Sequence, residues 1–392
     1  MVSAAYPTTA SPEVAALADE VRAAAGRGEA LRIVGAGTWL DAGRPVRAKA
    51  RLELASLAGV IEYVPGDLTI TVRAGTTLER IAEITEAEGQ WLALDPYGSE
   101  EATIGAVVAT ASAGPLAAIF GAPRDQVLGL EFVTGDGAVA RGGGRVVKNV
   151  AGFDLVRLVT GAWGTLGIVT EVTLRLRARP ERDVTLLAPV AADPASVDAV
   201  TKALRALPFS PFAAELVDAA LAKRVALGAR PALLVRLGGS ASVVRAQRDA
   251  LMHALGPLLR GPIDEAPPEE AWSSIRGAEF PGAAAVRFSA PAASFATTWD
   301  EATYVGARVT GSVVSGSPLR GVVRASLPGD EASLRPALSG RRAASACARV
   351  YERLPAALWS RFAPSAVSDR LSQNVKQAFD PKGVLNPGIL GE

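Results

Sequence analysis

The chain has 392 residues, and its 41 basic and 40 acidic side chains give a net charge of +1 at pH 7. This balance excludes nucleic acid as the main partner, because binding phosphate requires a basic face. The single cysteine, Cys347, excludes an internal disulfide and a cysteine-ligated iron–sulfur cluster. The single histidine, His253, excludes any site that needs two histidines of this chain.

The N-terminal residues and one uncharged stretch bear on where the protein resides. Residues 1–10 lack the basic start and long apolar core of a signal peptide, so we expect a cytoplasmic protein. Residues 102–123 carry no charge and are about as long as a membrane span. They also contain Pro115, Pro123 and several glycines, which break a helix. We therefore expect a buried helix and loop that face a ligand, and no transmembrane span.

The first 180 residues have the pattern of an α+β unit, and the length of the chain predicts two or more domains. The expected elements, in chain order, are a helix from Pro12 to a stop at Gly26, a strand at 31–34, a strand at 68–73, a helix capped by Gly75–Thr77 that runs to Glu88, and a strand at 127–134 that Gly135–Gly137 turn into a hairpin. Residues 171–177 alternate polar and apolar side chains, which predicts a last strand with one face in water.

The pattern changes at Pro180 and indicates a second α+β domain. Its expected elements are a helix at 197–207, a strand at 232–237, a helix at 243–255 and a loop rich in proline and acid at 262–270. The tail starts as a helix near Leu371 and then contains Phe379-Asp380-Pro381 and Asn386-Pro387-Gly388.

Glycine-rich turns are the strongest sign of a ligand site. Segments 148–155 and 161–172 set several glycines and Asp154 against a short apolar helix and a strand. A backbone that bends without side chains can approach a flat, charged ligand closely. Residues 35–38, Gly-Ala-Gly-Thr, follow a buried strand and could present adjacent N–H groups to an anion. Taken alone, this last segment fits a plain turn between strands equally well.

Together with 102–106, 112–115, 124–129 and 386–388, these segments resemble FAD-binding proteins of the vanillyl-alcohol oxidase/p-cresol methylhydroxylase type, in the order that the family has them. Among these proteins the chain is most similar to glycolate oxidase subunits. The resemblance implies an α+β fold: a two-subdomain FAD-binding domain at 1–180, a cap domain at 181–350 that binds substrate, and a C-terminal segment, 351–392, that packs back on the flavin domain.

The resemblance also implies the residues that contact FAD. These are Gly35, Ala36, Gly37, Thr38, Pro96, Thr103, Gly105, Ser112, Ala113, Gly114, Arg124, Gly161, Gly164, Thr165, Gly167, Ile168 and Asn386. Ala106 departs from the family's Ala-Thr-Ile-Gly-Gly pattern by one methyl group, which is tolerable if only its N–H faces the cofactor. Family members that hold FAD covalently use a histidine in or near the first two loops, and here neither has one, so we expect non-covalent FAD.

Three arginines in apolar, strand-like segments are candidates for binding a substrate: Arg236, Arg287 and Arg324. A buried arginine is unusual unless it is paired, and a guanidinium can bind a carboxylate through two hydrogen bonds. Each of the three could equally lie on the wet face of a sheet or pair with a local acid. Arg287 comes first, because its segment resembles an Arg-x-Ser strand of glycolate oxidase subunits.

The resemblance implies oxidation of a small 2-hydroxy acid, glycolate to glyoxylate, in a complex with a second flavoprotein subunit and an iron–sulfur subunit. Association with a membrane would then come through these partners. Two other functions stay open: a stand-alone FAD-dependent dehydrogenase of another small hydroxy acid or alcohol, and a non-catalytic flavin-binding subunit. A general base near the flavin would favour the stand-alone enzyme, and its absence would favour the assembly subunit.

Overall fold

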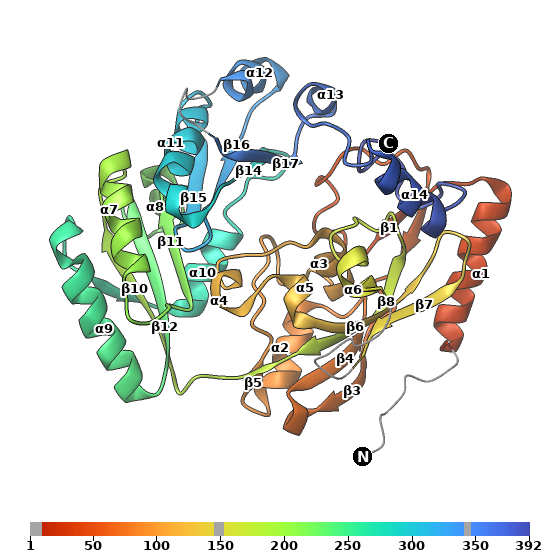
Figure 1. Cartoon of the computed structure of the whole chain (residues 1–392), viewed down its shortest axis with the longest axis horizontal. Helices are drawn as coiled ribbons and strands as arrows, with labels where there is room; N and C mark the ends of the chain where they lie inside the picture. Colours follow the sequence, from red (N-terminus) through yellow and green to blue (C-terminus); the bar gives the residue numbers. More distant parts are fainter. Residues whose placement is uncertain (1–9, 145–152, 341–345) are drawn as a thin grey trace.

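The computed structural model describes residues 10–144, 153–340 and 346–392 (Figure 1). Two β-sheets lie beside each other, and helices cover them. The first sheet is built from residues between 60 and 175 and the second from residues between 182 and 353. This arrangement confirms the expected α+β fold, while the domain boundaries at 180 and 350 stay a prediction.

The N-terminal region contains short elements joined by tight turns. Its helices are α1 (Pro12–Arg27), α2 (Leu78–Glu86), α3 (Ile104–Thr110), α4 (Ala117–Phe120), α5 (Pro123–Gln126) and α6 (Leu155–Val159). Its strands are β1 (Leu31–Val34), β2 (Ala50–Glu53), β3 (Val60–Val64), β4 (Thr69–Arg73), β5 (Gln90–Trp91), β6 (Val127–Val133), β7 (Val139–Gly143), β8 (Ile168–Arg175) and β9 (Arg177–Ala178).

Helix α1 begins as predicted and ends later. The Ser11 hydroxyl accepts a hydrogen bond from the Val14 N–H, and Pro12 occupies the first turn, where a missing N–H costs nothing. The predicted stop at Gly26 is wrong. The helix continues to Arg27 and closes at Gly28, whose φ of 64° is the left-handed conformation that satisfies the last carbonyl groups.

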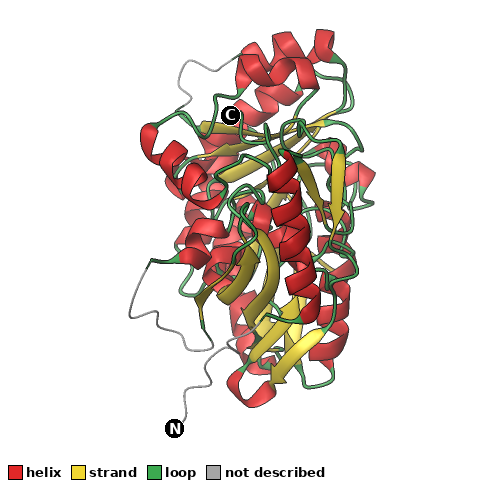
Figure 2. Cartoon of the chain, turned by 90° about the vertical axis from the view of Figure 1, so that its right-hand side faces the viewer, coloured by secondary structure: helices red, strands yellow, loops and turns green. Residues whose placement is uncertain are grey.

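Strands β3, β4, β8, β6 and β7 form an antiparallel sheet in that order, and β1 pairs with β2 in parallel beside it. The prediction that β8 has a face in water holds only in part, since Glu171 and Arg175 are half-buried. On that face Thr173 is buried and shares a hydrogen bond with Thr71, and the fully buried Glu131 accepts one from Thr170. Helix α1 runs over the strands on this side of the molecule (Figure 2), and its apolar stripe packs with Val133 and Ile168.

The second sheet has eight antiparallel strands. Its order is β13 (Asp264–Ala266), β10 (Arg182–Pro189), β12 (Ala232–Gly239), β11 (Ala213–Val217), β15 (Val313–Ser317), β16 (Val322–Leu327), β14 (Ala284–Ser289) and β17 (Ala348–Arg353). The accompanying helices are α7 (Pro194–Arg205), α8 (Ala219–Arg224), α9 (Ala241–Leu255), α10 (Pro268–Arg276), α11 (Phe295–Gly306) and α12 (Glu331–Ser339). The expected loop at 262–270 is wrong, since it holds β13 and the start of α10.

The two faces of the second sheet have different partners. Helices α7, α9, α11 and α12 pack on one face around Trp299 and Phe295, which are fully buried. The opposite face packs with α8, α10 and Leu116 of the N-terminal region. This second face is turned toward the N-terminal sheet (Figure 1), so side chains that alternate onto it meet the loops of the first region.

The uncharged stretch 102–123 contains α3, α4 and the loops around them. It ends at the first residue of α5. Buried residues of this stretch include Ile104 and Val108, which belong to the core of the five-stranded sheet. Among the described residues, no helix combines the length and the apolar character that crossing a membrane requires.

The C-terminal tail returns to the N-terminal region through α13 (Trp359–Phe362) and α14 (Arg370–Phe379), which lies beside α1 in Figure 1. The buried Asp380 carboxylate accepts hydrogen bonds from the N–H groups of Val384 and Leu385 at 3.0 and 2.9 Å and from the Lys376 ammonium at 2.6 Å. The Lys376 ammonium also donates to the Thr165 carbonyl at 2.9 Å. Leu385 pairs with Leu31 as an extra bridge beside β1.

Replacing Asp380 with Ala should release this tail. The change leaves a buried ammonium and two N–H groups without their acceptor, a loss worth about 3 kcal/mol or more. Amide hydrogen exchange at 383–390 should then rise by roughly a hundred-fold. As a control, Asp369→Ala removes an exposed helix cap at the start of α14 and should cost only about 1 kcal/mol. Equal exchange in the two variants would contradict the anchoring role of Asp380.

Candidate functional site

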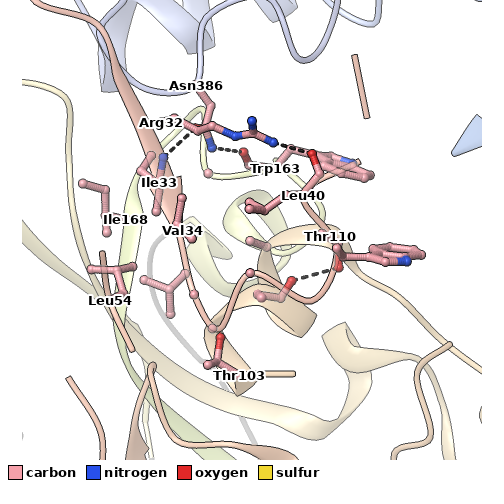
Figure 3. Close-up of a pocket in the computed structure, with 18 of the residues that line it drawn as sticks. Arg32, Ile33, Val34, Leu40, Leu54, Thr103, Thr110, Trp163, Ile168 and Asn386 are labelled. Carbon is pink, nitrogen blue, oxygen red and sulfur yellow. Dashed lines mark hydrogen bonds between the residues drawn. The ribbon is translucent and has the colours of Figure 1, made fainter. Parts of the chain in front are cut away.

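The glycine-rich segments meet at one cavity, which we call the glycine-loop cavity. It has about 870 Å³ of space, counted to its open mouth. Its walls come from the loop after β1, the start of α3, the loop before β8 and the tail (Figure 3). Segments separated by hundreds of residues thus face the same space.

The first loop presents backbone donors to this cavity. The N–H groups of Gly35, Ala36, Gly37 and Thr38 donate to no acceptor within the described ranges. A Cβ on Gly35 would lie 2.3 Å from the Thr103 hydroxyl oxygen, so only glycine allows this loop to approach α3. The Thr103 hydroxyl does not cap its own helix. Free N–H groups and a free hydroxyl suit the oxygens of a diphosphate.

Asn386 holds two walls of the cavity together. Its side-chain oxygen accepts a hydrogen bond from the Ile33 N–H at 2.8 Å, and its side-chain nitrogen donates to the Trp163 carbonyl at 2.8 Å (Figure 3). Trp163 has a φ of 55°, which costs energy for a side chain of this size. The hydrogen bond from its N–H to the Ala109 carbonyl, at 2.7 Å, and the contact with Asn386 hold it there.

A second cavity, of about 1400 Å³, lies between the two sheets. We call it the arginine cavity, because its lining includes Arg44, Arg287, Arg320, Arg324 and Arg349. Both cavities are lined by Trp39 and Trp163, whose rings stack with their centroids 6.4 Å apart. The two cavities therefore adjoin at this pair of tryptophans.

Acids neutralise most of the arginines in this cavity. The Arg287 Nε donates to Glu352 at 2.9 Å, Arg324 pairs with both Glu352 and Glu279, and Arg349 pairs with the buried Glu301. Burial raises the pKa of the Glu352 carboxyl, but the charges of Arg324 and Arg287 outweigh burial and hold that pKa below its usual value. Glu352 is therefore ionised and already occupied by its two arginines.

Arg320 and Arg44 differ from the other three. Arg320 donates to the carbonyl groups of Ala113 and Gly114 at 3.0 and 2.7 Å, and Arg44 donates to carbonyl groups of the tail. Within the described parts of the chain, no carboxylate oxygen lies within 4.0 Å of either guanidinium. Arg320 extends from the turn between β15 and β16 to the loop after α3, so it spans the gap between the two regions.

A row of polar side chains crosses the face of the second sheet that is turned toward the cavity. Cross-strand pairing sets Arg287 opposite Arg324, and Arg324 opposite Ser315. One step from the pair Leu216 and Gly316, the register places Glu215 opposite Ser317. The Glu215 side chain is fully buried, and neither its carboxylate oxygens nor the Ser317 hydroxyl has a partner in hydrogen-bonding geometry among the described residues.

Burial perturbs three ionisable groups beside this row. Burial raises the pKa of Glu215 to about 8, and the nearby Ser315 hydroxyl and Arg320 offset only part of the effect. Burial also raises the pKa of Asp95 to about 6, against the opposing charge of Arg276. Burial and then the charge of Glu215 raise the pKa of the Tyr97 hydroxyl, which lines the arginine cavity.

The structure brings most of the predicted cofactor residues to these two cavities. Those that line the glycine-loop cavity are Gly35, Ala36, Gly37, Thr38, Thr103, Gly105, Gly164, Gly167, Ile168 and Asn386, and those that line the arginine cavity are Ser112, Ala113 and Gly161. The buried Ser112 hydroxyl has no partner within the described residues, as expected of a group that awaits a ligand. Residues 148–152 of the predicted glycine segment lie outside the described residues.

Four predicted cofactor residues do not line either cavity: Pro96, Gly114, Arg124 and Thr165. Arg124 is exposed and lies 3.9 Å from Asp125, and the Thr165 hydroxyl donates to the Ala162 carbonyl. Of the substrate candidates, Arg287 and Arg324 line the arginine cavity. Arg236 does not, and it donates two hydrogen bonds to Asp183 at 2.9 and 2.6 Å.

The sequence did not indicate Arg320, Tyr97 or Glu215. Arg320 follows a Pro-Leu pair in an ordinary turn, and Glu215 interrupts the apolar strand Ala-Ala-Glu-Leu-Val. An acid in the middle of such a strand was the one available signal, since a buried carboxylate is rare without a partner.

Comparison with known proteins identifies the region around the glycine-loop cavity. Residues 10–143 match the family described as FAD binding domain. The glycolate oxidase subunit GlcE of Escherichia coli K12 is 39% identical over 197 residues, which cover 50% of this chain and 56% of that protein. The glycolate oxidase subunit GlcD of Bacillus subtilis 168 is 34% identical over 47% of this chain and 42% of its own length. The chain thus spans about half the length of these curated relatives.

Solved structures show the same fold over nearly the whole chain. p-Cresol methylhydroxylase with substrate bound aligns with 96% of this chain and 87% of its own, with a TM-score of 0.76 and 16% sequence identity. Alkyldihydroxyacetonephosphate synthase aligns with 96% of this chain and 74% of its own, with a TM-score of 0.66 and 16% identity. The predicted fold type is therefore confirmed, and the family match of residues 10–143 confirms FAD as the cofactor.

Valine at Gly105 or Gly164 should lower the FAD content. A Cβ on Gly105 would lie 2.7 Å from the Ala74 Cβ and push α3 away from the sheet, and Gly164 has a φ of 71° that a β-branched residue tolerates poorly. Flavin absorbance per mole of purified protein measures the effect. Gly66→Val is the control, because that site is open and has no positive φ. Full flavin content in both test variants would show that these glycines are ordinary turns.

Proposed function

Since residues 10–143 form a domain of the FAD binding family, we propose that this chain is an FAD-dependent oxidoreductase that acts on a small 2-hydroxy acid such as glycolate. One observation carries the proposal: the glycine-loop cavity of the cofactor domain adjoins a cavity with five arginines. The names of its relatives, glycolate oxidase subunits, support the choice of a hydroxy acid. A cationic wall beside a flavin suits a small anion.

The residues present fit FAD. The free N–H groups of 35–38 and the Thr103 hydroxyl would hold the diphosphate, and the Ser112 hydroxyl would meet the flavin end, where the two cavities join. The flavin supplies two-electron redox chemistry, and the chain supplies binding, orientation and electrostatics. The FAD is proposed to be non-covalent, because the one histidine, His253, is on α9 behind the second sheet.

Among the arginines of the cavity, Arg320 is the best placed to bind the substrate carboxylate. Arg287 and Arg324 also line the cavity, but each is paired with a glutamate. A substrate carboxylate would have to compete with that glutamate for the guanidinium. Arg320 carries no such pair among the described residues and contacts the loop of Ala113, which lines the same cavity. A charge-assisted hydrogen bond from this guanidinium would fix the substrate beside the flavin.

We further propose that the chain works in an assembly, as the word subunit in the names of GlcE and GlcD suggests. Its partners would be a second flavoprotein subunit and an iron–sulfur subunit, and contact with a membrane would come through them. A stand-alone dehydrogenase and a non-catalytic flavin subunit are the alternatives. Turnover by the purified chain alone would favour the first, and FAD that no hydroxy acid reduces, in the chain or in the assembly, would favour the second.

Purified protein, or apoprotein mixed with FAD, should show a flavin absorption spectrum. Acid precipitation should release the flavin into the supernatant, because no histidine lines either cavity to link it. The measurement is the flavin absorbance of supernatant and pellet. Flavin that stays in the pellet would contradict non-covalent binding.

Replacing Arg320 with Lys should weaken the binding of oxalate, an unreactive analogue of a 2-hydroxy acid. Losing a charge-assisted contact costs about 2 kcal/mol or more, so the dissociation constant should rise roughly 30-fold or more. Titration of flavin absorbance with oxalate measures it.

Two matched variants test the choice of Arg320. Arg44→Lys changes the other arginine of the cavity that lacks a carboxylate partner, and Arg287→Lys changes one that has Glu352. Both should bind oxalate within a few-fold of wild type, with unchanged flavin content. A larger loss in Arg287→Lys than in Arg320→Lys would assign the substrate carboxylate to Arg287 instead.

A further inference from the structure

Oxidation of a hydroxy acid also releases a proton, and the cavity offers few groups to accept it. The only histidine is on α9, and the one acid among the lining residues, Glu352, is held by Arg287 and Arg324. Tyr97 is on the cavity wall, with a hydroxyl that has no protein partner among the described residues. It is one of the neutral hydroxyl groups of this wall, together with Tyr351 and Ser112, and it is the one whose pKa the charge of Glu215 raises.

Glu215 is near enough to Tyr97 to act on it electrostatically. After burial, the charge of Glu215 is the main cause that raises the pKa of the Tyr97 hydroxyl. Tyr97 and Ser315, whose hydroxyl is near the Glu215 carboxyl, both line a small cavity of about 260 Å³. Both carboxylate oxygens of Glu215 lack a partner in hydrogen-bonding geometry among the described residues, although the side chain is fully buried.

Such a carboxyl is costly, because burial removes its hydration and the nearby Ser315 hydroxyl and Arg320 offset only part of that loss. The groups that face it come from two strands, the turn between them and one loop of the N-terminal region. They are Ser315 and Ser317 of β15, Arg320 of the following turn, Arg324 of β16, and Asp95 and Tyr97 of the loop after β5. The two arginines favour its ionised form, and burial and Asp95 favour its protonated form.

We propose that Tyr97 and Glu215 form a proton relay: Tyr97 takes the hydroxyl proton of the substrate and passes its own proton to Glu215. This inference rests on the proposed function. The C2 hydrogen would leave with its bonding electron pair, as a hydride for the oxidised flavin, while the O–H bond breaks, its electron pair forms the C=O bond and its proton goes to the Tyr97 oxygen. The Tyr97 proton moves at the same time to a Glu215 carboxylate oxygen, directly or through one water, and the substrate becomes the 2-oxo acid. Tyr97 is the catalytic residue, and Glu215 positions and stores the proton.

The relay predicts the direction of the pH dependence. Protonated Glu215 cannot accept a proton and the ionised form can, so flavin reduction should rise with pH and level off above about 8. A base whose pKa lies near the working pH combines a useful ionised fraction with high basicity.

Glu215→Gln tests the relay with little change of shape. In anaerobic stopped-flow mixing of the holoprotein with glycolate, the variant should lose the rise near pH 8 and react about 10²–10⁴-fold more slowly at pH 9. Tyr97→Phe should have the same effect on the rate. Asp95→Asn is the matched control: it should keep the rise but shift it to lower pH, because a neighbouring negative charge is removed. Flavin content and oxalate affinity should stay at the wild-type level in all three.

Infrared spectroscopy gives a readout that does not depend on turnover. The C=O stretch of a buried protonated carboxyl should disappear with a midpoint near pH 8 in wild type and in Tyr97→Phe, and be absent in Glu215→Gln. A wild-type protein that no hydroxy acid reduces, with this band intact, would overturn the proposed function and with it the role of the relay. Reduction with an unchanged pH profile in Glu215→Gln, or no band that depends on Glu215, would overturn the relay alone.

Discussion

The side-chain amide of Asn386 fixes the geometry on which both cavities depend. It satisfies a donor at Ile33 and an acceptor at Trp163 that would otherwise be buried without partners. An amide side chain offers both functions at once, whereas an ionised carboxylate cannot donate. The Asn386 side chain thus connects residues that are far apart in the chain. Its hydrogen bond to Trp163 also helps to hold the left-handed backbone conformation of that residue.

A second constraint comes from charges that alternate at the interface between the regions. Arg287, Glu352, Arg324, Glu279 and Arg353 form a connected series of ion pairs that ends at Asp41, in the segment after the glycine loop. Removing Arg324, the most buried member, would leave Glu352 and Glu279 each without one partner, which costs far more than the pair contributes. Every acid of this series is already paired with an arginine of the series. None is left to neutralise the other arginines of the cavity wall, which therefore stays cationic.

The local signals in the sequence predicted most of the fold. Ser11 with Pro12, the hairpin at 135–137 and the glycine loops act through their own backbone, so they can be recognised without the rest of the chain. The stop of α1 was misplaced because Gly26 fits a helix, whereas only the left-handed Gly28 ends it. Glu215 could not be predicted as part of the site. Its neighbours Ser315, Ser317 and Arg324 reach it through strand register, which no local pattern specifies.

The contacts between the glycine loop and β17 have a thermodynamic consequence. The Gly43 N–H donates to the Glu352 carbonyl at 2.8 Å, and the Arg353 Nε lies 2.8 Å from the Asp41 carboxylate. The strand that carries the arginine pairs is therefore joined to the segment that follows the diphosphate loop. If an anion in the arginine cavity shifts this contact and so changes the affinity for the nucleotide, the nucleotide must change the affinity for that anion by the same factor. The dissociation constant of each ligand then depends on whether the other ligand is bound.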